Sequence, residues 1–221
     1  MSITQHPGEE FLLDYTTGSL TEGWSLAIAA HLTFCTKCRK ATADIEALGG
    51  AMLESIESKH IEANTVDKII EKTTQLNTSR DLKPKKITNS KNNLNELPTL
   101  LLPYIDGSKN EIPWKRLGFG VNQFLLKTSD ETTTARLLKI PGDRSVLEHS
   151  HNGLELTVVL AGKFSDETGT YCKGDFQQAD EQLTHRPQTI GEGPCVCLLV
   201  TNSPLKFTGS MGRLLQPLLG I

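Results

Sequence analysis

The residues best suited to chemistry lie near the start of the chain, where a histidine precedes a Cys-x-x-Cys pair. His31 lies four residues before Cys35, and Cys38 follows three residues later. Because residues three and four apart share one face of a helix, these side chains can converge without a long loop. Zn²⁺ prefers imidazole and thiolate ligands, and His6 offers a fourth. Such a set favours a closed structural zinc site over a catalytic one, which needs an open position.

Other interpretations of the cysteine pair stay open. Cys-x-x-Cys also serves as a redox pair, and a free cysteine is often only a small buried apolar residue. The redox pair usually follows a strand, and no strand pattern precedes residue 35, which favours zinc. Both functions can coexist, because oxidation of ligand thiolates would release the metal. Spacing alone also leaves His6 open as the fourth ligand.

A second group of metal-binding residue types lies in the C-terminal half. His149 and His151 would share one face of a strand, Glu155 follows an Asn-Gly turn, and His185 would come from a later strand. Three imidazoles and a carboxylate suit a divalent first-row metal. This H-x-H-x3-E…H arrangement matches the cupin signature, although Ala179-Asp180-Glu181 replace the usual Pro-x-Gly before the last histidine. Whether the site catalyses stays open, because nothing else nominates an acid, a base or a substrate clamp.

Helical spacing of apolar residues surrounds the first group. Ser19 and Glu22 have the S-x-x-E spacing of a capping box, and Gly49-Gly50 is a weak point in a later helix. Met52 and Leu53 are expected in a core, but so small a bundle must leave some apolar surface for a partner. The expected helices run from Glu10 to Gly18, from Ser19 to about His31, from Cys35 to Ile56 and from Asn64 to Leu76.

After residue 98 the apolar period changes from 3.6 to 2, which indicates strands. Many short strands separated by turns predict a β-sandwich or barrel, of which the jelly roll is one solution. The fold class is therefore α + β with two domains: a helical zinc-binding domain over 1–76, a linker over 77–98 and a cupin-like metal-binding domain over 99–221. The expected strands run over 117–121, 123–127, 133–140, 154–164 and 196–201.

Charge and cysteine content limit the class of protein. The chain has 221 residues with 23 basic and 26 acidic side chains, and residues 1–75 carry 11 acidic and 6 basic ones. An acidic first domain argues against direct nucleic-acid binding and suits a basic protein partner. The five cysteines fit a reducing compartment. No apolar run approaches the roughly 18 residues of a membrane span, and the start lacks the features of a signal peptide, so we expect a cytoplasmic protein without membrane contact.

The remaining cysteines leave two interpretations open. Cys195 and Cys197 lie two residues apart on one face of a late strand, where they could respond to oxidants or simply pack. Cys172 lies in an expected turn, so we expect it to be exposed.

Taken together, the chain resembles the ChrR family of cytoplasmic zinc-binding anti-sigma factors, over both halves. The resemblance implies that His6, His31, Cys35 and Cys38 bind structural zinc, and that His149, His151, Glu155 and His185 bind the cupin metal. It also implies that the helical domain wedges against an extracytoplasmic-function-type sigma factor and blocks its RNA-polymerase-binding surfaces. The cupin-like domain would then be needed for the response to singlet oxygen or related oxidants.

Two classes of function follow from these patterns. The favoured hypothesis is a transcriptional regulator that sequesters a sigma factor and releases it under oxidative stress. The alternative is a metal-dependent cupin enzyme, of the dioxygenase or isomerase type, with an accessory zinc domain. Copurification distinguishes the two hypotheses, because only a regulator should copurify with a coexpressed sigma factor.

Overall fold

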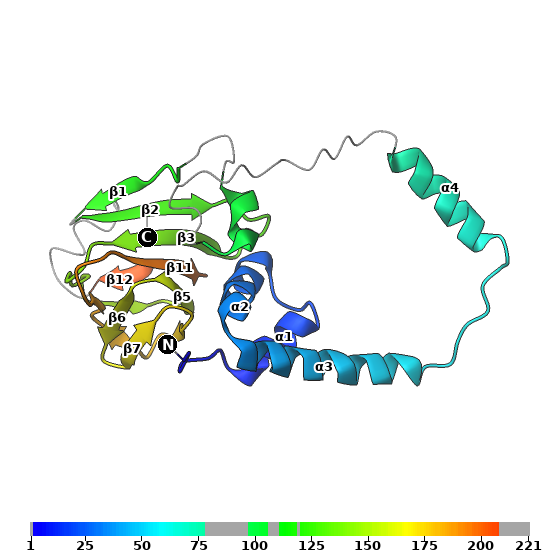
Figure 1. Ribbon diagram of the computed structural model, residues 1–221, viewed down its shortest axis with the longest axis horizontal. Coiled ribbons are helices and arrows are strands. Elements are labelled where there is room, and N and C mark those ends of the chain that lie inside the picture. The colour runs from blue at the N-terminus through cyan, green and yellow to red at the C-terminus, as the bar shows by residue number, and fades with distance from the viewer. Residues whose placement is uncertain (1, 78–96, 106–110, 119, 208–221) are drawn as a thin grey trace. The chain divides into compact units, whose positions relative to one another are not determined.

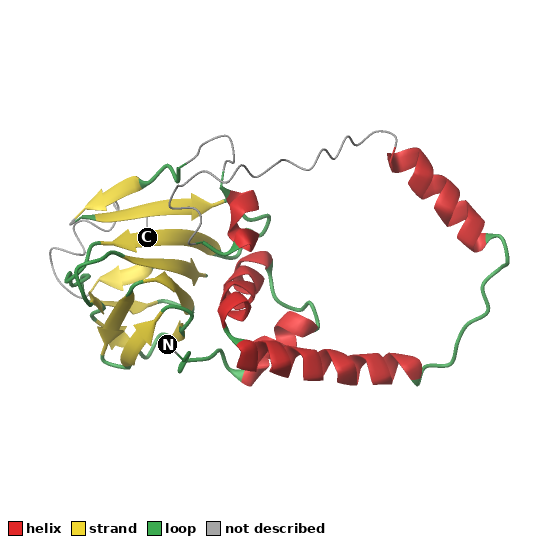
Figure 2. Ribbon diagram, viewed as in Figure 1, coloured by secondary structure: helices red, strands yellow, loops and turns green. Residues whose placement is uncertain are grey.

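Helices and strands occupy separate parts of the chain (Figure 2). A computed structural model describes residues 2–77, 97–105, 111–118 and 120–207. The predicted α + β class is confirmed, because the helices precede the strands in the chain. The helices are α1 (Glu9–Thr16), α2 (Glu22–Phe34), α3 (Thr36–Glu54), α4 (Thr65–Asn77) and the 3₁₀ helix η2 (Thr99–Tyr104).

The strands of the described residues form three antiparallel sheets. The large sheet has the order β1-β2-β3-β11-β5-β8, and the two small sheets have the orders β10-β6-β7 and β12-β4-β9. Strand β11 lies between β3 and β5, so segments far apart in sequence form the centre of the large sheet (Figure 1). The strands are β1 (Lys115–Gly118), β2 (Val121–Leu126), β3 (Thr134–Ile140), β4 (His149–His151), β5 (Glu155–Ala161), β6 (Lys163–Asp166), β7 (Gly169–Cys172), β8 (Phe176–Ala179), β9 (Thr184–His185), β10 (Gln188–Thr189), β11 (Cys195–Thr201) and β12 (Leu205–Phe207).

One predicted strand is divided at a glycine. The run 154–164 breaks at Gly162, which has a φ of +74°, and its halves β5 and β6 belong to different sheets. A Cβ atom at this position would lie 2.6 Å from the carbonyl oxygen of Pro194. A larger residue would therefore be strained both by its positive φ and by this close contact. The bend carries the chain from the large sheet to a small one.

The predicted capping box of α2 is wrong. The helix begins at Glu22, and its N-cap residue Thr21 makes no side-chain capping bond. Instead the amide of Gly23 donates to the Asp130 carboxylate over 2.8 Å. The Glu22 carboxylate accepts hydrogen bonds from Ser129 and from the Tyr104 hydroxyl, and these bonds lower the pKa of Glu22. Contacts with distant residues have replaced the local ones.

Helix α2 packs against β5 and β11 of the large sheet. Its residues Ala27, Ile28 and Ala30 are completely buried, and they belong to the same apolar core as Leu156 and Leu198. Burial of a large aliphatic side chain contributes about 1.5–3 kcal/mol, so this shared core holds the helix firmly on the sheet.

The contacts divide the chain into two compact units. Met1–Glu46 and Asn92–Ile221 form the first unit, and Ala47–Lys91 form the second. The early helices share a core with the sheets because a few short helices bury little apolar surface by themselves. The domain boundaries at residues 76 and 98 stay a prediction, since the linker lies outside the described residues except at its ends.

Helices α3 and α4 expose apolar side chains along the second unit. Helix α3 continues through Gly49-Gly50 and ends at Glu54, so those glycines do not break it. The Met52–Leu53 pair is exposed, contrary to its expected place in a core, and Leu53 is 70% exposed. No helix of the described residues combines the length and hydropathy that a membrane span requires. We define the apolar stripe by its exposed members Leu48, Met52, Leu53, Ile56, Val66, Ile69 and Ile70.

Candidate metal centres

The first group of predicted ligands comes together where α2 meets α3. His6 precedes α1, His31 lies in the last turn of α2, Cys35 links the two helices, and Cys38 lies in the first turn of α3. One potential ligand atom from each residue lies within 4.8 Å of all the others. The Nδ1 atom of His6 is 3.4 Å from the sulfur of Cys35 and 3.4 Å from that of Cys38. Cys35 has an extended backbone between the two helices, and this break in the helical path lets the four side chains converge.

The hydrogen bond of His31 shows which of its nitrogens is available to a cation. Its Nδ1–H donates to the carbonyl oxygen of Gly174 over 2.8 Å. The other nitrogen, Nε2, therefore carries a lone pair, and it is buried without a hydrogen-bond partner among the described residues. A buried lone pair without a partner is costly, and a metal ion would satisfy it.

The protonation states around this cluster also fit Zn²⁺. Burial lowers the pKa of His31 to about 4, and burial followed by the nearby Lys37 lowers that of His6. Both imidazoles are then neutral at pH 7, as metal ligands must be. Burial and the neighbouring Cys35 raise the pKa of Cys38 to about 12, so a metal would have to displace its thiol proton. Metal binding at this cluster would thus release protons.

The second group of predicted ligands gathers between the large sheet and a small one. His149 and His151 lie on β4, His185 on β9, and Glu155 begins β5. His149 and His185 are paired directly across the two strands. All four residues are buried, and their potential ligand atoms lie within 4.8 Å of one another.

The three imidazoles of this second group point Nε2 atoms at one another. The Nε2 of His185 lies 3.0 Å from that of His149 and 3.2 Å from that of His151. His149 donates its Nδ1–H to the carbonyl oxygen of Leu147, and His185 donates its own to the Asp166 carboxylate over 2.7 Å. Their Nε2 atoms therefore hold facing lone pairs, which repel unless a cation lies between them.

Glu155 completes this arrangement. Its Oε2 atom and the Nδ1 of His151 lie 3.6 Å apart, and both lack hydrogen-bond partners among the described residues. Burial raises the pKa of Glu155 to about 7, and burial followed by neighbouring histidines lowers the pKa of His149 and of His151 to about 4. These shifts show that burial disfavours the charged form of each side chain. A divalent cation in the cluster would balance the negative charge of an ionised Glu155.

Sequence reasoning missed the residues that hold His185 in place. Asp166 accepts hydrogen bonds from His185, Thr168 and Gln177. Burial alone would raise the pKa of Asp166, but these bonds outweigh it and lower that pKa. A carboxylate behind a ligand histidine fixes its tautomer and makes it a stronger ligand. Asp166 opens the run Asp-Glu-Thr-Gly, whose composition is typical of a turn, but no spacing rule pairs it with a histidine 19 residues away.

A cavity of about 720 Å³ adjoins the second cluster. Its wall includes the ligand candidates His149, Glu155 and His185 together with apolar side chains such as Leu138 and Phe207. A metal held by these residues could therefore be reached by a small molecule.

The later cysteines differ in burial. Cys195 and Cys197 are buried on β11 with their sulfur atoms 3.6 Å apart, and Cys197 also lines the cavity. The contact with Cys195, followed by burial, raises the pKa of the Cys197 thiol, so that thiol is a poor nucleophile. Cys172 ends strand β7 and is half-buried, so its predicted exposure is only partial.

The chain thus joins helices with a His/Cys cluster to a β domain with a three-histidine, one-glutamate cluster, which places it among two-domain proteins with two candidate metal sites. Residues 107–205 match the family model of the ChrR cupin-like domain. The chain is 34% identical over 217 residues to anti-sigma-E factor ChrR of Cereibacter sphaeroides, which covers 98% of each chain. The chain therefore belongs to the ChrR family of anti-sigma factors.

A solved structure supports the same conclusion. The chain is similar to the crystal structure of Rhodobacter sphaeroides SigE in complex with the anti-sigma ChrR, with a TM-score of 0.73 and 32% identity. The match covers 90% of this chain and 99% of that one. The resemblance inferred from the sequence is confirmed, and the chain is a regulator rather than the cupin enzyme of the alternative hypothesis.

Proposed function

We propose that this chain sequesters a sigma factor of the extracytoplasmic-function type in the cytoplasm and releases it under oxidative stress such as singlet oxygen. The structure to which it is similar contains an anti-sigma ChrR together with SigE. The observation that carries the proposal within this chain is the apolar stripe of α3 and α4.

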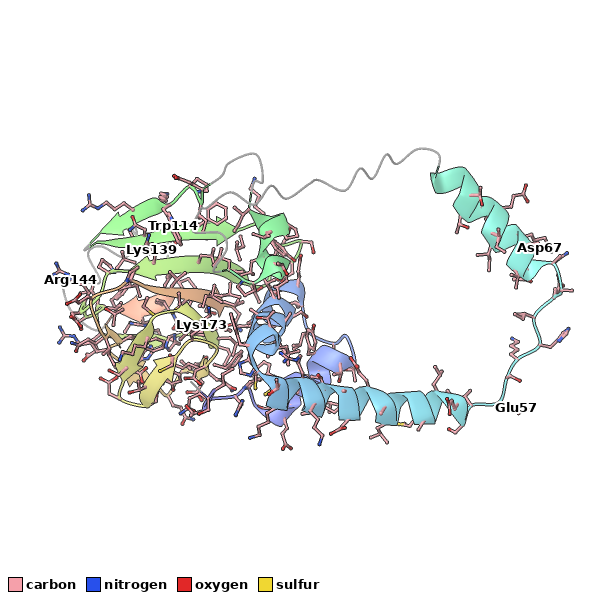
Figure 3. All side chains as sticks on the ribbon, in the orientation of Figure 1. Glu57, Asp67, Trp114, Lys139, Arg144 and Lys173 are labelled. Atoms are coloured by element: carbon pink, nitrogen blue, oxygen red, sulfur yellow. The ribbon has the colours of Figure 1, made fainter. Side chains whose placement is uncertain are left out.

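The apolar stripe has the properties of a protein-binding surface. Leu48 and Met52 are four residues apart on α3, and Val66, Ile69 and Ile70 have helical spacing on α4, so each helix presents an apolar face. Each of these side chains is more than half exposed. Exposed apolar faces of this kind usually bind a partner. Residues 47–77 carry five acidic and three basic side chains, with Glu57 and Asp67 labelled in Figure 3, and this balance favours a basic partner for this part of the second unit.

The two clusters have separate roles in this proposal. Zn²⁺ bound by His6, His31, Cys35 and Cys38 organises the helices, because a structural zinc site contributes its binding energy to folding. A divalent metal at His149, His151, Glu155 and His185 belongs to the response, since the adjoining cavity gives small molecules access to it. A signal releases the partner only if it changes the energies of the bound and free states differently.

Transcription with purified components tests sequestration. The full chain, added to RNA polymerase and its partner sigma factor of the extracytoplasmic-function type, should inhibit sigma-dependent transcription. The double variant Leu53→Lys/Ile69→Lys should lose inhibition and keep its metal content, because both residues belong to the apolar stripe. Leu125→Lys is the matched control, since Leu125 is also exposed but lies on β2. Full inhibition by the double variant, or none by the wild type, would contradict the proposal.

Substitution of the zinc ligands tests the first cluster. Cys35→Ala or Cys38→Ala should lose zinc and sigma binding together, because structural zinc contributes on the order of 10 kcal/mol or more in small domains. His6→Ala should be milder, since water can take the fourth position. Zinc content and copurification with the sigma factor are measured, with Cys195→Ala, on β11, as the control. A Cys38→Ala protein with full zinc and full inhibition would exclude this site.

A further inference from the structure

The connection between β7 and β8 contacts the segment that carries His6. We call residues 172–175 the β7–β8 turn. Asp175, which is only 2% exposed, accepts hydrogen bonds from the amides of Thr4 and Gln5 on one carboxylate oxygen, over 2.8 and 3.0 Å. Its other oxygen accepts the amide of Cys172 over 2.7 Å. The two residues before His6 are thus fastened to a turn of the β domain.

The same turn contacts the end of α2, which carries His31. The carbonyl oxygen of Gly174 accepts the Nδ1–H of His31 over 2.8 Å. A Cβ atom on Gly174, whose φ is +92°, would lie 2.7 Å from Ile3 and 2.9 Å from Phe34, so this approach requires glycine. The Lys173 ammonium, labelled in Figure 3, lies 5.5 Å from the centre of the Phe34 ring.

The residue after the turn also belongs to this contact. The amide of Phe176 donates to the carbonyl oxygen of Gln5 over 3.2 Å, and its ring meets that of His31 edge to face at 5.7 Å. The Asp175 carboxylate acts electrostatically on both His6 and His31. The hydrogen bonds between this region and the early residues therefore involve either His31 itself or the two residues just before His6.

These contacts have the form of an outer shell around a metal site. A metal-ligating histidine usually donates its second N–H to a carbonyl or carboxylate oxygen, which orients the ring. Here the acceptor lies 143 residues further along the chain. Loss of such a partner typically weakens metal binding by about 10–100-fold.

We propose that the β7–β8 turn is the outer shell of the zinc site, in which Gly174 orients His31 and Asp175 holds the segment of His6. This inference rests on zinc binding at the first cluster, as proposed above. Asp175 is a positioning residue, because its carboxylate bonds to backbone amides and not to the metal. Zinc binding and packing of the early residues against the β domain are consequently linked, and each strengthens the other by the same factor.

Cobalt(II) titration of the full-length protein tests this role. Thiolate-to-cobalt charge-transfer absorption reports only on the cluster with cysteine ligands, so the second cluster does not interfere, and displacement of cobalt then gives the zinc affinity. Asp175→Ala should weaken binding by about 10–100-fold. Asp175→Asn, which retains one acceptor oxygen, should restore part of the affinity.

Asp130→Ala is the matched control for a general loosening of the helices. Asp130 also accepts a backbone amide of α2, but at the end of the helix remote from His31. Its loss should leave the cobalt affinity unchanged. Gln5→Pro removes one donor to Asp175 without changing the β domain, so it should also weaken cobalt binding. This variant tests the same contact if Asp175→Ala fails to fold.

Hydrogen exchange supplies a second measurement. Zinc should slow exchange of the amides of Thr4, Gln5, Cys172 and Phe176 in the wild type, because linkage acts in both directions. Unchanged exchange at Cys172 and Phe176, together with wild-type affinity in the Asp175→Ala and Gln5→Pro proteins, would overturn the inference. Equal weakening in Asp130→Ala would also overturn it. If the wild type shows no thiolate–cobalt absorption, or if Cys38→Ala retains it, the first cluster is not a zinc site. The proposed outer shell is then contradicted as well.

Discussion

The acceptors of the hydrogen bonds on the far side of the candidate ligand histidines differ in charge. His31 and His149 donate to the carbonyl oxygens of Gly174 and Leu147, whereas His185 donates to the carboxylate of Asp166. A charged acceptor makes a shorter and stronger hydrogen bond than a neutral one. Among these three histidines, His185 therefore gains most as a ligand from its partner.

Asp166→Asn should weaken metal binding at the second cluster by about 10–100-fold. The amide keeps the size of the side chain but removes the charge that supports His185. Calorimetric titration of the Cys38→Ala protein with a divalent metal isolates this cluster. Asp143→Asn serves as the control, because Asp143 bonds to a loop amide and its left-handed backbone tolerates asparagine. Equal affinities of the Asp166 variant and the wild type would show that the hydrogen bond has no role in metal binding.

The sequence identified the candidate ligands but not the residues that orient them. His149 and His151 lie two apart, and Cys35 and Cys38 three apart, so their convergence follows from strand and helix geometry. Asp166, Gly174 and their histidine partners are joined only by the tertiary fold. No local spacing encodes such pairs, and they could not have been predicted without the sheet order.

At the scale of elements, the start of α2 is capped by a residue of another segment. Asp130 precedes β3 and accepts the amide of Gly23, together with the amides and hydroxyls of Thr132 and Thr133. Gly23 is needed there, because a Cβ atom would collide with the Thr133 hydroxyl. One carboxylate thus orders the loop before β3 and holds α2 to it.

Asp130→Ala should lower the free energy of unfolding by about 1 kcal/mol, as loss of an N-cap typically does. Urea denaturation of the full-length protein measures this change. The control is Asp180→Ala, because the Asp180 carboxylate accepts a local amide, that of Gln182, and not an amide of α2. A variant as stable as the wild type would show that the cap contributes nothing.

The same carboxylate predicts a dependence on acid. Burial alone would raise the pKa of Asp130, but the hydrogen bonds outweigh it and lower that pKa. A depressed pKa stabilises the folded state above the ordinary value of 3.8, and this stabilisation is lost as the pH falls through the folded-state pKa. The difference in unfolding free energy between wild type and Asp130→Ala should therefore shrink below about pH 4. A constant difference from pH 7 to pH 3 would contradict this.

Long elements were predicted better than short ones. Helices α2 and α3 and strands β3 and β11 carry enough residues to show a period, and they lie close to their predicted ranges. Strands such as β9 and β10 contain two residues each, which is too short for any alternation to appear. The start of α2 was misplaced because its cap comes from Asp130 and not from the neighbouring serine.

At the scale of the whole molecule, we expect different parts of the chain to hold the sigma factor and to sense the oxidant. Residues 1–85 contain the first cluster and every residue of the apolar stripe, so this fragment alone should inhibit sigma-dependent transcription when zinc is saturating. Residues 99–221 alone should not inhibit. Purified transcription measures both, and an inactive first fragment or an inhibitory second one would reverse the assigned roles.

Two candidate sensors can be distinguished in cells. The variant His149→Ala/Glu155→Ala should still hold the sigma factor but fail to release it, because the metal-binding cluster would be lost. The variant Cys195→Ser/Cys197→Ser should respond normally. A sigma-dependent reporter challenged with singlet oxygen compares them. If the first variant responds and the second does not, the buried thiols are the sensor, through a disulfide or sulfenic acid.

The separation of Thr4 and Asp175 by 171 residues also matters while the protein is being made. During translation, the residues of the first cluster leave the ribosome early. The β7–β8 turn, which contacts His31 and the segment before His6, is complete only once residue 175 has been made. At about 5–20 residues per second, the interval is on the order of 10–30 s. Pulse alkylation during translation would measure how long Cys35 and Cys38 stay reactive. A nascent regulator would thus present open thiols to its surroundings well before its β domain exists.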